Sequence, residues 1–319
     1  MKREFITEHG PLLRRLAELK KLNGQNLNIH IYGESGVGKE VIARMIHEWG
    51  GDRERPFIPI NSAGIPATLV ESVLFGHEKG SFSGAIQNYK GKFEQANGGD
   101  LFLDEISELS PEIQAKLLRV LQDHEIDRIG SLKIIHSYFR LISASNKNLR
   151  VLVHEKQFRE DLYYRINNYE IEIPALRERP KDIPLLVRHF MDLYSEEQIE
   201  IEPEGMEKLC TYEWPGNVRE LESVMKLAIT LARGGCIRKE DIRICRGRPV
   251  CLPSFGQIQE GQTHRSAPTE YDRLVQAYEK ELIEKRLAQN NWHRIKTAKE
   301  LGISRNRLYK KMQALGINS

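Results

Sequence analysis

The sequence predicts an α/β fold in which helices cover a parallel sheet, followed by a small helical region and an all-helical C-terminal domain. Three observations lead to this prediction. Residues 27–45 (LNIHIYGESGVGKEVIARM) form an apolar-alternating run that breaks into glycines and resumes with helical spacing. Residues 96–105 (ANGGDLFLDE) describe a buried strand that ends in two carboxylates. From Pro180 onward, the apolar residues follow a helical period.

Length and composition indicate a soluble, cytoplasmic protein. At 319 residues and 36.9 kDa, the chain is long enough for one full domain and one or two small ones. Its apolar runs all stay well short of the roughly 18 residues that a membrane helix needs, and the N-terminus (MKREFITE) lacks the apolar core of a signal peptide. The four cysteines include no C-x-x-C pair, which favours reduced thiols over a zinc site. We expect no membrane partner.

The glycine-rich turn predicts a phosphate-binding loop. Glycines let the backbone bring N–H groups close to an anion, and the next helix directs its positive dipole end to the same point. Lys39 is expected to pair with the outer phosphates of a nucleotide. Glu40 stands where the generic motif G-x-x-x-x-G-K-[ST] has a hydroxyl that helps to hold magnesium. A glycine-rich turn without a ligand is the alternative. The residues expected around the nucleotide are Gly33, Glu34, Ser35, Gly36, Val37, Gly38, Lys39 and Glu40.

The segments on either side of this loop predict further elements of the sheet. Residues 12–22 (LLRRLAELKKL) have helical spacing and a polar face, so this helix should pack beside the first strand. Residues 57–62 (FIPINS) predict a second strand, which delivers Asn61 to the sheet edge where ligands collect in open α/β folds.

Residues 75–92 (FGHEKGSFSGAIQNYKGK) contain four glycines and too few apolar residues to fill a core. Composition favours a flexible surface loop. An exposed Phe82 at a glycine-hinged tip also suits a loop that grips a partner outside the protein. Both interpretations stay open at this point.

The strand at residues 96–105 places Asp104 and Glu105 at its end. In phosphate-loop ATPases, such a strand lies beside the first one, its Asp holds the nucleotide's Mg²⁺ and its Glu polarises the attacking water. We therefore assign Asp104 to the metal and Glu105 to the water. Acids that cap the next helix at Ser110 are an alternative that fits Glu108 better than these two residues.

Beyond a helix at residues 111–122, the sequence predicts a hairpin at 125–136 that turns at Gly130. Residues 138–145 (YFRLISAS) then predict another buried strand, which delivers Asn146 to the same edge. Asn146 would sense the γ-phosphate or orient the water, or else serve as a turn residue.

Arg159 and Arg165 lie six residues apart on a short helical stretch, residues 158–167 (FREDLYYRIN). They could be plain surface charge. If they instead reach a neighbouring subunit's nucleotide, they act as arginine fingers that neutralise charge in the transition state. A finger supplied in trans requires a head-to-tail contact between subunits, and such contacts close into rings.

Helical patterns at residues 182–196 and 203–212 precede WPGNVRELE at residues 214–222. Asn217 is expected to cap the helix that begins there. Arg219 falls in the first turns of this helix, from which it can point back at the nucleotide.

The C-terminal part predicts a helix-turn-helix joined by a linker. Residues 246–269 are rich in Gly, Pro, Gln and Ser and lack periodicity. Residues 271–289 form an amphipathic helix, followed by 294–301, a turn at Gly302 and a final helix at 304–315. An accessory helical bundle is the alternative.

The charge of this part favours a nucleic-acid partner. The net charge of the whole chain is only +3, but residues 270–319 hold 11 Lys/Arg against 6 Asp/Glu. Arg305, Asn306 and Arg307 begin the final helix, where base edges are read, and Lys310 and Lys311 are expected to meet phosphates. The candidate DNA-binding residues are Arg294, Lys296, Ser304, Arg305, Asn306, Arg307, Lys310 and Lys311.

The order of motifs GESGVGKE, GSFSGA, GGDLFLDE, FREDLYYR and WPGNVREL resembles the AAA+ ATPase domain of the sigma-54-dependent transcriptional activators, the bacterial enhancer-binding proteins. The resemblance covers about residues 5–238, and the C-terminal segment is similar to the Fis-type domain of the same family. It implies a AAA+ α/β subdomain at 1–173, a helical lid subdomain at 174–245, a linker at 246–269 and a helix-turn-helix domain at 270–319.

The resemblance also implies roles for single residues. Glu40 is the residue that the family usually carries at its position. The family's polymerase-contacting loop reads GAFTGA, and here Ser81 and Ser83 replace its Ala and Thr, with the hydroxyl kept at Ser83. Asn61 would couple Glu105 to that loop, and Arg219 would be the second sensor of the nucleotide. The implied sigma-factor contacts are Gly80, Ser81, Phe82, Ser83, Gly84 and Ala85.

The expected function is that of an ATP-driven, Mg²⁺-dependent activator. It would bind an upstream DNA site, assemble as a homo-oligomeric ring such as a hexamer, and remodel sigma-54 RNA polymerase to the open complex. Family members carry a receiver or ligand-sensing domain before the ATPase, whereas 26 residues precede the first strand here. This implies a regulator in trans or a truncated chain. The alternatives are a repressor or regulator of another polymerase, and a AAA+ machine that remodels nucleic acid.

Overall fold

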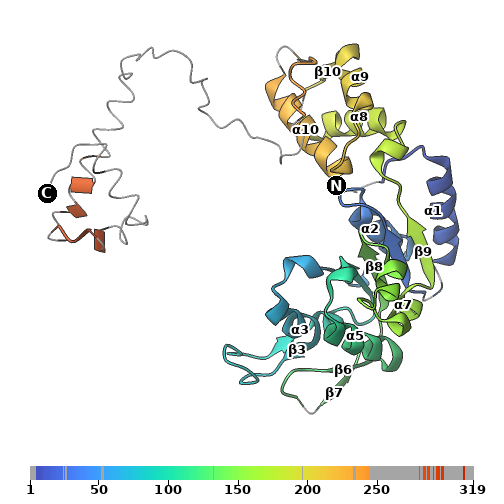
Figure 1. Ribbon diagram of the computed structural model, residues 1–319, viewed down its shortest axis with the longest axis vertical. Coiled ribbons are helices and arrows are strands. Elements are labelled where there is room, and N and C mark those ends of the chain that lie inside the picture. Colours follow the sequence, from blue (N-terminus) through green and yellow to red (C-terminus); the bar gives the residue numbers. More distant parts are fainter. Residues whose placement is uncertain are drawn as a thin grey trace. The chain divides into compact units, whose positions relative to one another are not determined.

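The computed structural model describes residues 5–23, 25, 27–51, 54–131, 133–195, 197–232 and 235–244, and single residues and short stretches between 280 and 312. The chain divides into two compact units, Met1–Leu252 and Pro253–Ser319. Figure 1 labels elements of the first unit. The elements are α1 (Gly10–Leu22), β1 (Ile29–Tyr32), α2 (Lys39–Trp49), β2 (Phe57–Asn61), η1 (Ser62–Gly64), α3 (Ala67–Phe75), β3 (Gly76–His77), β4 (Tyr89–Lys90), α4 (Lys92–Gln95), β5 (Asp100–Asp104), η2 (Ile106–Glu108), α5 (Pro111–Asp123), β6 (Glu125–Asp127), β7 (Ile134–His136), β8 (Arg140–Ser145), α6 (Leu149–His154), α7 (Glu160–Ile166), β9 (Tyr169–Glu172), η3 (Leu176–Glu178), α8 (Asp182–Tyr194), β10 (Glu200–Ile201), α9 (Pro203–Thr211), α10 (Asn217–Leu231) and β11 (Cys236–Ile237).

Within the described residues, five strands form one parallel sheet in the order β2-β5-β8-β1-β9. The expectation that the strand bearing the two carboxylates lies beside the first strand is therefore wrong, because β8 lies between β5 and β1. All six residues of β8 are buried. A strand whose side chains are all either apolar or hydrogen-bonded within the protein suits the centre of a sheet that is covered on both faces.

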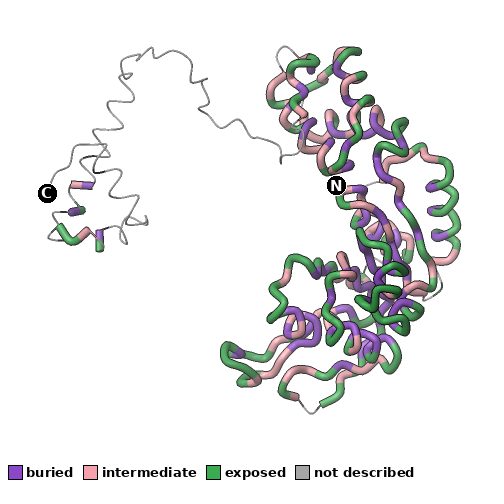
Figure 2. The backbone as a smooth tube through the Cα atoms, viewed as in Figure 1, coloured by how far each residue is buried: buried purple, intermediate pink, exposed green. Residues whose placement is uncertain are grey.

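The two faces of the sheet belong to separate apolar clusters, and Figure 2 colours buried stretches of the backbone purple. Successive side chains of a strand point to opposite faces. Leu101 and Leu103 accordingly pack with α3, α5 and α7, whereas Phe102 and Ile142 pack with α1 and α2. The predicted helix at residues 12–22 is thus confirmed, and it lies beside the first strand as expected.

The helical lid has its own core. Helices α8, α9 and α10 pack around Trp214, which is fully buried and whose indole donates a hydrogen bond to the Leu209 carbonyl at 2.8 Å.

The predicted hairpin is also present, as β6 paired antiparallel with β7. In the described part of the chain, none of the helices combines the length and apolar character needed to cross a membrane.

The second unit is described only in part. Residues 283–284, 286–287 and 296–297 are helical, and Ile283, Leu287 and Met312 are buried. The predicted linker at 246–269, the turn at Gly302 and most of the final helix lie outside the described residues.

Candidate nucleotide-binding site

The phosphate loop connects β1 to α2. Gly36 and Gly38 adopt φ of +80° and +107°, a region that side chains with a Cβ rarely occupy. A Cβ on Gly36 would lie 2.4 Å from the carbonyl oxygen of Gly216, so the close approach of the lid also requires glycine there. Helix α2 begins at Lys39, and its N-terminal N–H groups face the loop.

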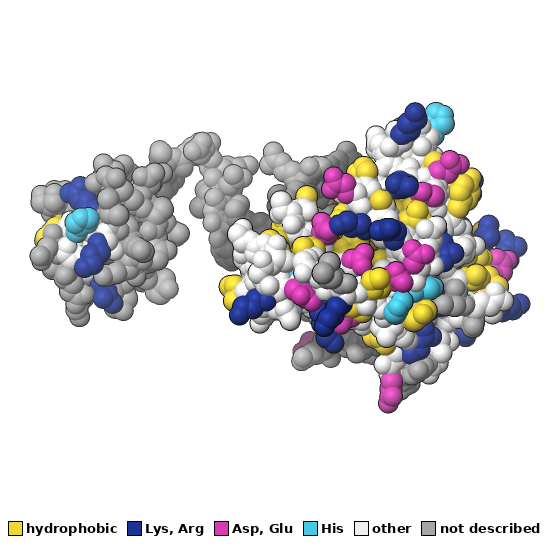
Figure 3. Space-filling view, turned by 90° about the horizontal axis from the view of Figure 1, so that it is seen from below, with side chains coloured by type: hydrophobic (Ala, Val, Ile, Leu, Met, Phe, Trp, Pro, Cys, Tyr) yellow, Lys and Arg dark blue, Asp and Glu magenta, His cyan; other side chains and the backbone are white. Residues whose placement is uncertain are grey.

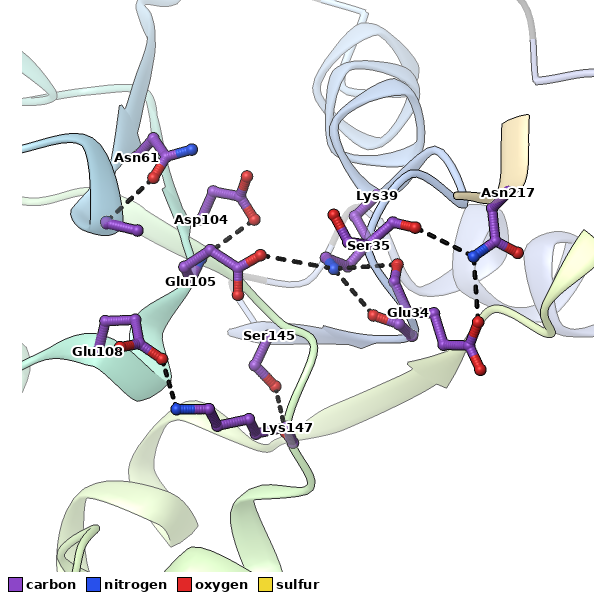
Figure 4. Close-up of polar contacts among 12 residues, drawn as sticks. Glu34, Ser35, Lys39, Asn61, Asp104, Glu105, Glu108, Ser145, Lys147 and Asn217 are labelled. Carbon is purple, nitrogen blue, oxygen red and sulfur yellow. Dashed lines mark hydrogen bonds and ion pairs between the residues drawn. The ribbon is translucent and has the colours of Figure 1, made fainter. Parts of the chain in front are cut away.

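Lys39 is the buried cation of the site, with 7% of its side chain exposed. Its Nζ donates to the carbonyl oxygens of Gly33 at 2.8 Å and Glu34 at 3.3 Å, and it lies 3.9 Å from Oε1 of Glu105 (Figure 4). Burial lowers the pKa of Lys39, while the carboxylates of Glu105 and Asp104 act against this decrease. The structure thus brings together the lysine and both carboxylates that the sequence singled out.

The two carboxylates follow one another at the end of β5. Glu105 has φ of +54°, which turns the chain sharply after the strand, and its backbone amide donates to Oδ1 of Asp104 at 3.0 Å. Burial raises the pKa of both carboxyl groups, and Lys39 opposes the rise. Oε2 of Glu105 is buried without a hydrogen-bond partner among the described residues. A buried, unpaired carboxylate oxygen beside a lysine fits a site completed by a ligand.

The donor set fits a magnesium ion that is held partly by phosphates. The described residues contain no group of three or more His, Cys, Asp or Glu able to bind a metal alone. Mg²⁺ usually takes only one or two protein carboxylates and completes its shell with water and phosphate oxygens. Asp104 offers such a carboxylate, whereas Glu40 pairs with Arg44 at 2.7 Å along the surface of α2.

The two asparagines at the sheet edge differ in what they contact. Asn61 is in register with Asp104, but its Oδ1 accepts hydrogen bonds from the amides of Ala63 and Gly64 and so caps the turn η1. Asn146 is exposed, and its backbone N–H tends to lower the pKa of Glu105, which burial raises.

The lid is attached to the phosphate loop through Glu34. Its carboxylate accepts hydrogen bonds from Arg177 at 2.6 and 2.9 Å and from Nδ2 of Asn217 at 3.1 Å, and these bonds lower the pKa of Glu34 to about 2. Asn217 also donates to the Ser35 carbonyl and accepts from the Leu176 amide. The expectation that Asn217 caps α10 is wrong, because its fully buried side chain is used between η3 and the phosphate loop.

Arg219 lies where the sequence predicted, directed at the phosphate loop. Its Nη1 donates to Oγ of Ser35 at 3.1 Å, and its backbone amide donates to the Gly36 carbonyl at 3.3 Å. A guanidinium at this position can reach a nucleotide phosphate held by the same loop.

A cavity of about 770 Å³ opens between the phosphate loop and the lid. Its walls include Phe5, Val37 and Phe190, and the guanidinium of Arg179 lies 5.2 Å from the centroid of the Phe5 ring. A mostly apolar pocket of this size suits the base and sugar of a nucleotide. Sequence reasoning missed these residues because they come from segments far apart in the chain and form no local motif.

The two candidate finger arginines lie on or beside α7. Arg159 pairs with Asp161 at 2.7 Å and is 46% exposed, and Arg165 donates to the carbonyl of Leu121. Among the described contacts, neither arginine touches the phosphate loop of its own chain.

The segment with Phe82 is a compact turn on an antiparallel pair of short strands, β3 and β4. The amide of Gly80 donates to the Ala85 carbonyl at 2.9 Å, and the Phe82 ring, 39% exposed, meets His77 edge-on at 5.0 Å. Ile86 is 82% exposed, a feature that sequence reasoning did not single out. Phe82 lies outside the apolar clusters of the core, as expected.

The hairpin β6–β7 packs against this turn. The amide of Glu78 donates to the Ile129 carbonyl at 3.0 Å, and a Cβ on Gly130 would lie 2.5 Å from the Cβ of Ser81. Figure 3 shows Lys/Arg and Asp/Glu side chains intermingled with apolar ones on one face of the first unit.

Of the candidate DNA-binding residues, Arg294 is half-buried and Lys296 is exposed. Ser304, Arg305, Asn306, Arg307, Lys310 and Lys311 lie outside the described residues.

A parallel sheet with a phosphate loop, an Asp–Glu pair on a strand two places away and a helical lid with an inward arginine define a AAA+ ATPase. Residues 5–172 match the sigma-54 interaction domain, residues 177–244 the AAA+ ATPase lid domain and residues 275–315 the Fis family of bacterial regulatory proteins. The chain belongs to the sigma-54-dependent transcriptional activators, a family with a DNA-binding helix-turn-helix.

Two relatives match most of the chain. The regulatory protein AtoC of Escherichia coli is 43% identical over 98% of this chain and 68% of its own length. The activator HyfR of the same organism is 43% identical over 90% of this chain and 44% of its own length. The chain therefore spans 44% of the length of HyfR and 68% of the length of AtoC.

The fold is also similar to that of solved structures. NtrX from Brucella abortus in complex with ADP superimposes with a TM-score of 0.69 at 30% identity, over 98% of this chain and 70% of NtrX. Its complex with ATP gives a TM-score of 0.68 at 29% identity, over 99% and 70% of the two chains.

Proposed function

We propose that the protein binds ATP between the phosphate loop and the lid, hydrolyses it in a ring of identical subunits, and uses the reaction to remodel sigma-54 RNA polymerase to the open complex. The observation that carries this proposal is the position of Lys39, 3.9 Å from a Glu105 carboxylate whose second oxygen is buried and has no hydrogen-bond partner in the described part of the chain. The NtrX structures, solved in complex with ATP and with ADP, support nucleotide binding by this chain.

The residues of this chain divide the chemistry among them. Lys39 exchanges its carbonyl partners for the outer phosphates, and the amides of the loop bind the others. Glu105, whose pKa is raised by burial, polarises the attacking water. Asp104 would hold Mg²⁺, which neutralises developing charge on the phosphates. Arg219 follows the nucleotide state and transmits it to the lid.

Coupling to the polymerase runs through the Phe82 turn. Asn61, next to Asp104 in the sheet, relays the state of Glu105 to α3, and α3 leads directly into β3 at the base of the turn. Phe82 and its neighbours, residues 80–85, contact the sigma factor.

DNA binding belongs to the second unit. Arg294 and Lys296, with the candidate residues between 304 and 311, bind an upstream activator site and concentrate the ring near the promoter.

An open-complex assay tests the proposal. Purified protein, ATP, sigma-54 RNA polymerase and a promoter with an upstream site are combined, and promoter melting is measured with permanganate alongside phosphate release. We expect melting that requires hydrolysable ATP. ATP hydrolysis without melting would favour a repressor or a regulator of another polymerase. Melting or unwinding of DNA without the polymerase would favour a nucleic-acid-remodelling machine.

A further inference from the structure

His30 is a buried titratable residue to which neither the motifs nor the proposed chemistry gives a role. It lies in β1, 1% exposed, and is paired in register with Ser143 of β8. Side chains two residues apart on a strand share a face, so one ring can reach both Ser143 and Ser145. Its Nδ1 lies 3.0 Å from Oγ of Ser143, and its Nε2 lies 3.3 Å from Oγ of Ser145.

The donor and acceptor of each contact can be assigned. Oγ of Ser145 donates its only proton to the Lys147 carbonyl at 2.7 Å, so it can only accept from the ring. His30 must therefore carry its proton on Nε2. Nδ1 then accepts a hydrogen bond from the Ser143 hydroxyl. This hydroxyl lies closer to Nδ1, at 3.0 Å, than to the Ile29 carbonyl, at 3.4 Å. Burial and the charge of Lys39 lower the pKa of His30 to about 4, which keeps the ring neutral.

The chain of bonds ends at the catalytic edge. Ser145 and Lys147 flank Asn146, and the bond between them closes the turn that carries it (Figure 4). The same turn is bonded to the segment that follows Glu105, because Nζ of Lys147 donates to Oε1 of Glu108 at 2.7 Å, and the backbone N–H of Asn146 tends to lower the pKa of Glu105. The hydrogen bond from His30 to Ser145 therefore connects to this turn, whereas the hydrogen bond from His30 to Ser143 connects only to β1 and β8.

We propose that His30 is a positioning residue for hydrolysis, which acts through Ser145 to hold the turn of Asn146 against Glu105. This inference rests on the proposed ATP hydrolysis at this site. Nothing in it requires His30 to touch the nucleotide, so His30 should affect the rate of the chemical step and leave nucleotide affinity unchanged.

Two matched pairs of variants test the proposal. Ser145→Ala and Ser143→Ala each remove one hydroxyl from a fully buried site and leave one ring nitrogen unpaired. His30→Gln can place an amide near the position of Nε2 and bond Ser145, whereas the shorter His30→Asn reaches only Ser143. For each variant, kcat, ATP affinity, oligomeric state and melting temperature are measured on full-length protein.

We expect kcat to fall about 10- to 100-fold in Ser145→Ala and His30→Asn, since small displacements of a positioned group cost rates of this order. Ser143→Ala and His30→Gln should stay within about threefold of the parent under the same reasoning. ATP affinity should be unchanged in all four. A kcat equal in the two serine variants, or one that follows melting temperature alone, would overturn the proposal. Absence of ATPase in the parent protein would instead refute the proposed function.

Discussion

Lys39 and Glu105 lie side by side but act on different states of the reaction. The lysine meets phosphates in the ground state, whereas the glutamate acts on the water in the transition state. Because only the second interaction is specific to the transition state, the two side chains should separate binding from catalysis when each is removed.

We predict that Lys39→Ala abolishes ATP binding, and that Glu105→Gln binds ATP normally but hydrolyses it about 10² to 10⁴ times more slowly, the range typical of a lost general base. The glutamine keeps the shape of the side chain and removes only its basicity. Fluorescent nucleotide titration and phosphate release measure the two properties. A similar loss of ATP affinity in both variants would contradict this division.

His30 also predicts how stability depends on pH. Burial, together with the charge of Lys39, lowers its pKa from 6.5 in the unfolded chain to about 4 in the folded protein. The unfolded state therefore binds the proton first, and folding loses stability as pH falls from 6.5 to 4. The loss attributable to His30 is about 3 kcal/mol. Denaturant unfolding of the parent and of His30→Gln between pH 7 and 4.5 measures it, and equal pH slopes would refute it.

At the scale of elements, the attachment of the lid to the phosphate loop depends on two kinds of hydrogen bond. Asn217 is fully buried and its side chain makes three hydrogen bonds to the phosphate loop and η3, whereas Arg177 is 42% exposed in its pair with Glu34. Removing a partner from a buried amide leaves polar groups without water, while an exposed ion pair is replaced by solvent.

We predict that Asn217→Ala lowers the free energy of unfolding by about 2 to 4 kcal/mol, and that Arg177→Ala lowers it by less than about 1 kcal/mol. Urea unfolding of the two variants at pH 7 makes the comparison. Equal losses would mean that the Asn217 hydrogen bonds are replaced when its side chain is removed.

The Phe82 turn exposes an aromatic side chain that packs in none of the apolar clusters of the core. Phe82→Ala should keep ATP hydrolysis within about twofold of the parent and abolish promoter melting, because an exposed aromatic contributes through a partner contact. Ile86→Ala is the control: it removes an even more exposed apolar side chain outside residues 80–85 and should still melt the promoter. Melting at the parent's rate in Phe82→Ala would exclude the turn as the coupling element.

At the scale of the whole molecule, α7 offers arginines that its own nucleotide site does not use. If Arg159 and Arg165 act on a neighbour's nucleotide, Arg159→Ala and Arg165→Ala should each be inactive alone but regain partial ATPase when mixed with Lys39→Ala. The mixture pairs an intact site with an intact arginine, and a finger contributes about 10³ to 10⁵ in rate. Co-assembled mixtures no more active than their components would assign these arginines to surface charge.

The sequence by itself determined the parts whose physics is local. The strand, glycines and Lys39 are contiguous, Asp104 and Glu105 follow their strand directly, and hydrophobic period alone located α1, α5 and the lid helices. For such segments, the residues that matter are neighbours in the chain, and a pattern of residue types is enough to place them.

Only the tertiary structure decided which segments meet. It placed β8 between β5 and β1, directed Asn217 to Glu34 across 183 residues, and enclosed the cavity between Phe5 and the lid. It also joined His30 to two serines of β8. Strand order and the partners of buried polar groups follow from burying all apolar surface and satisfying all hydrogen bonds at once, so no local window of sequence contains them.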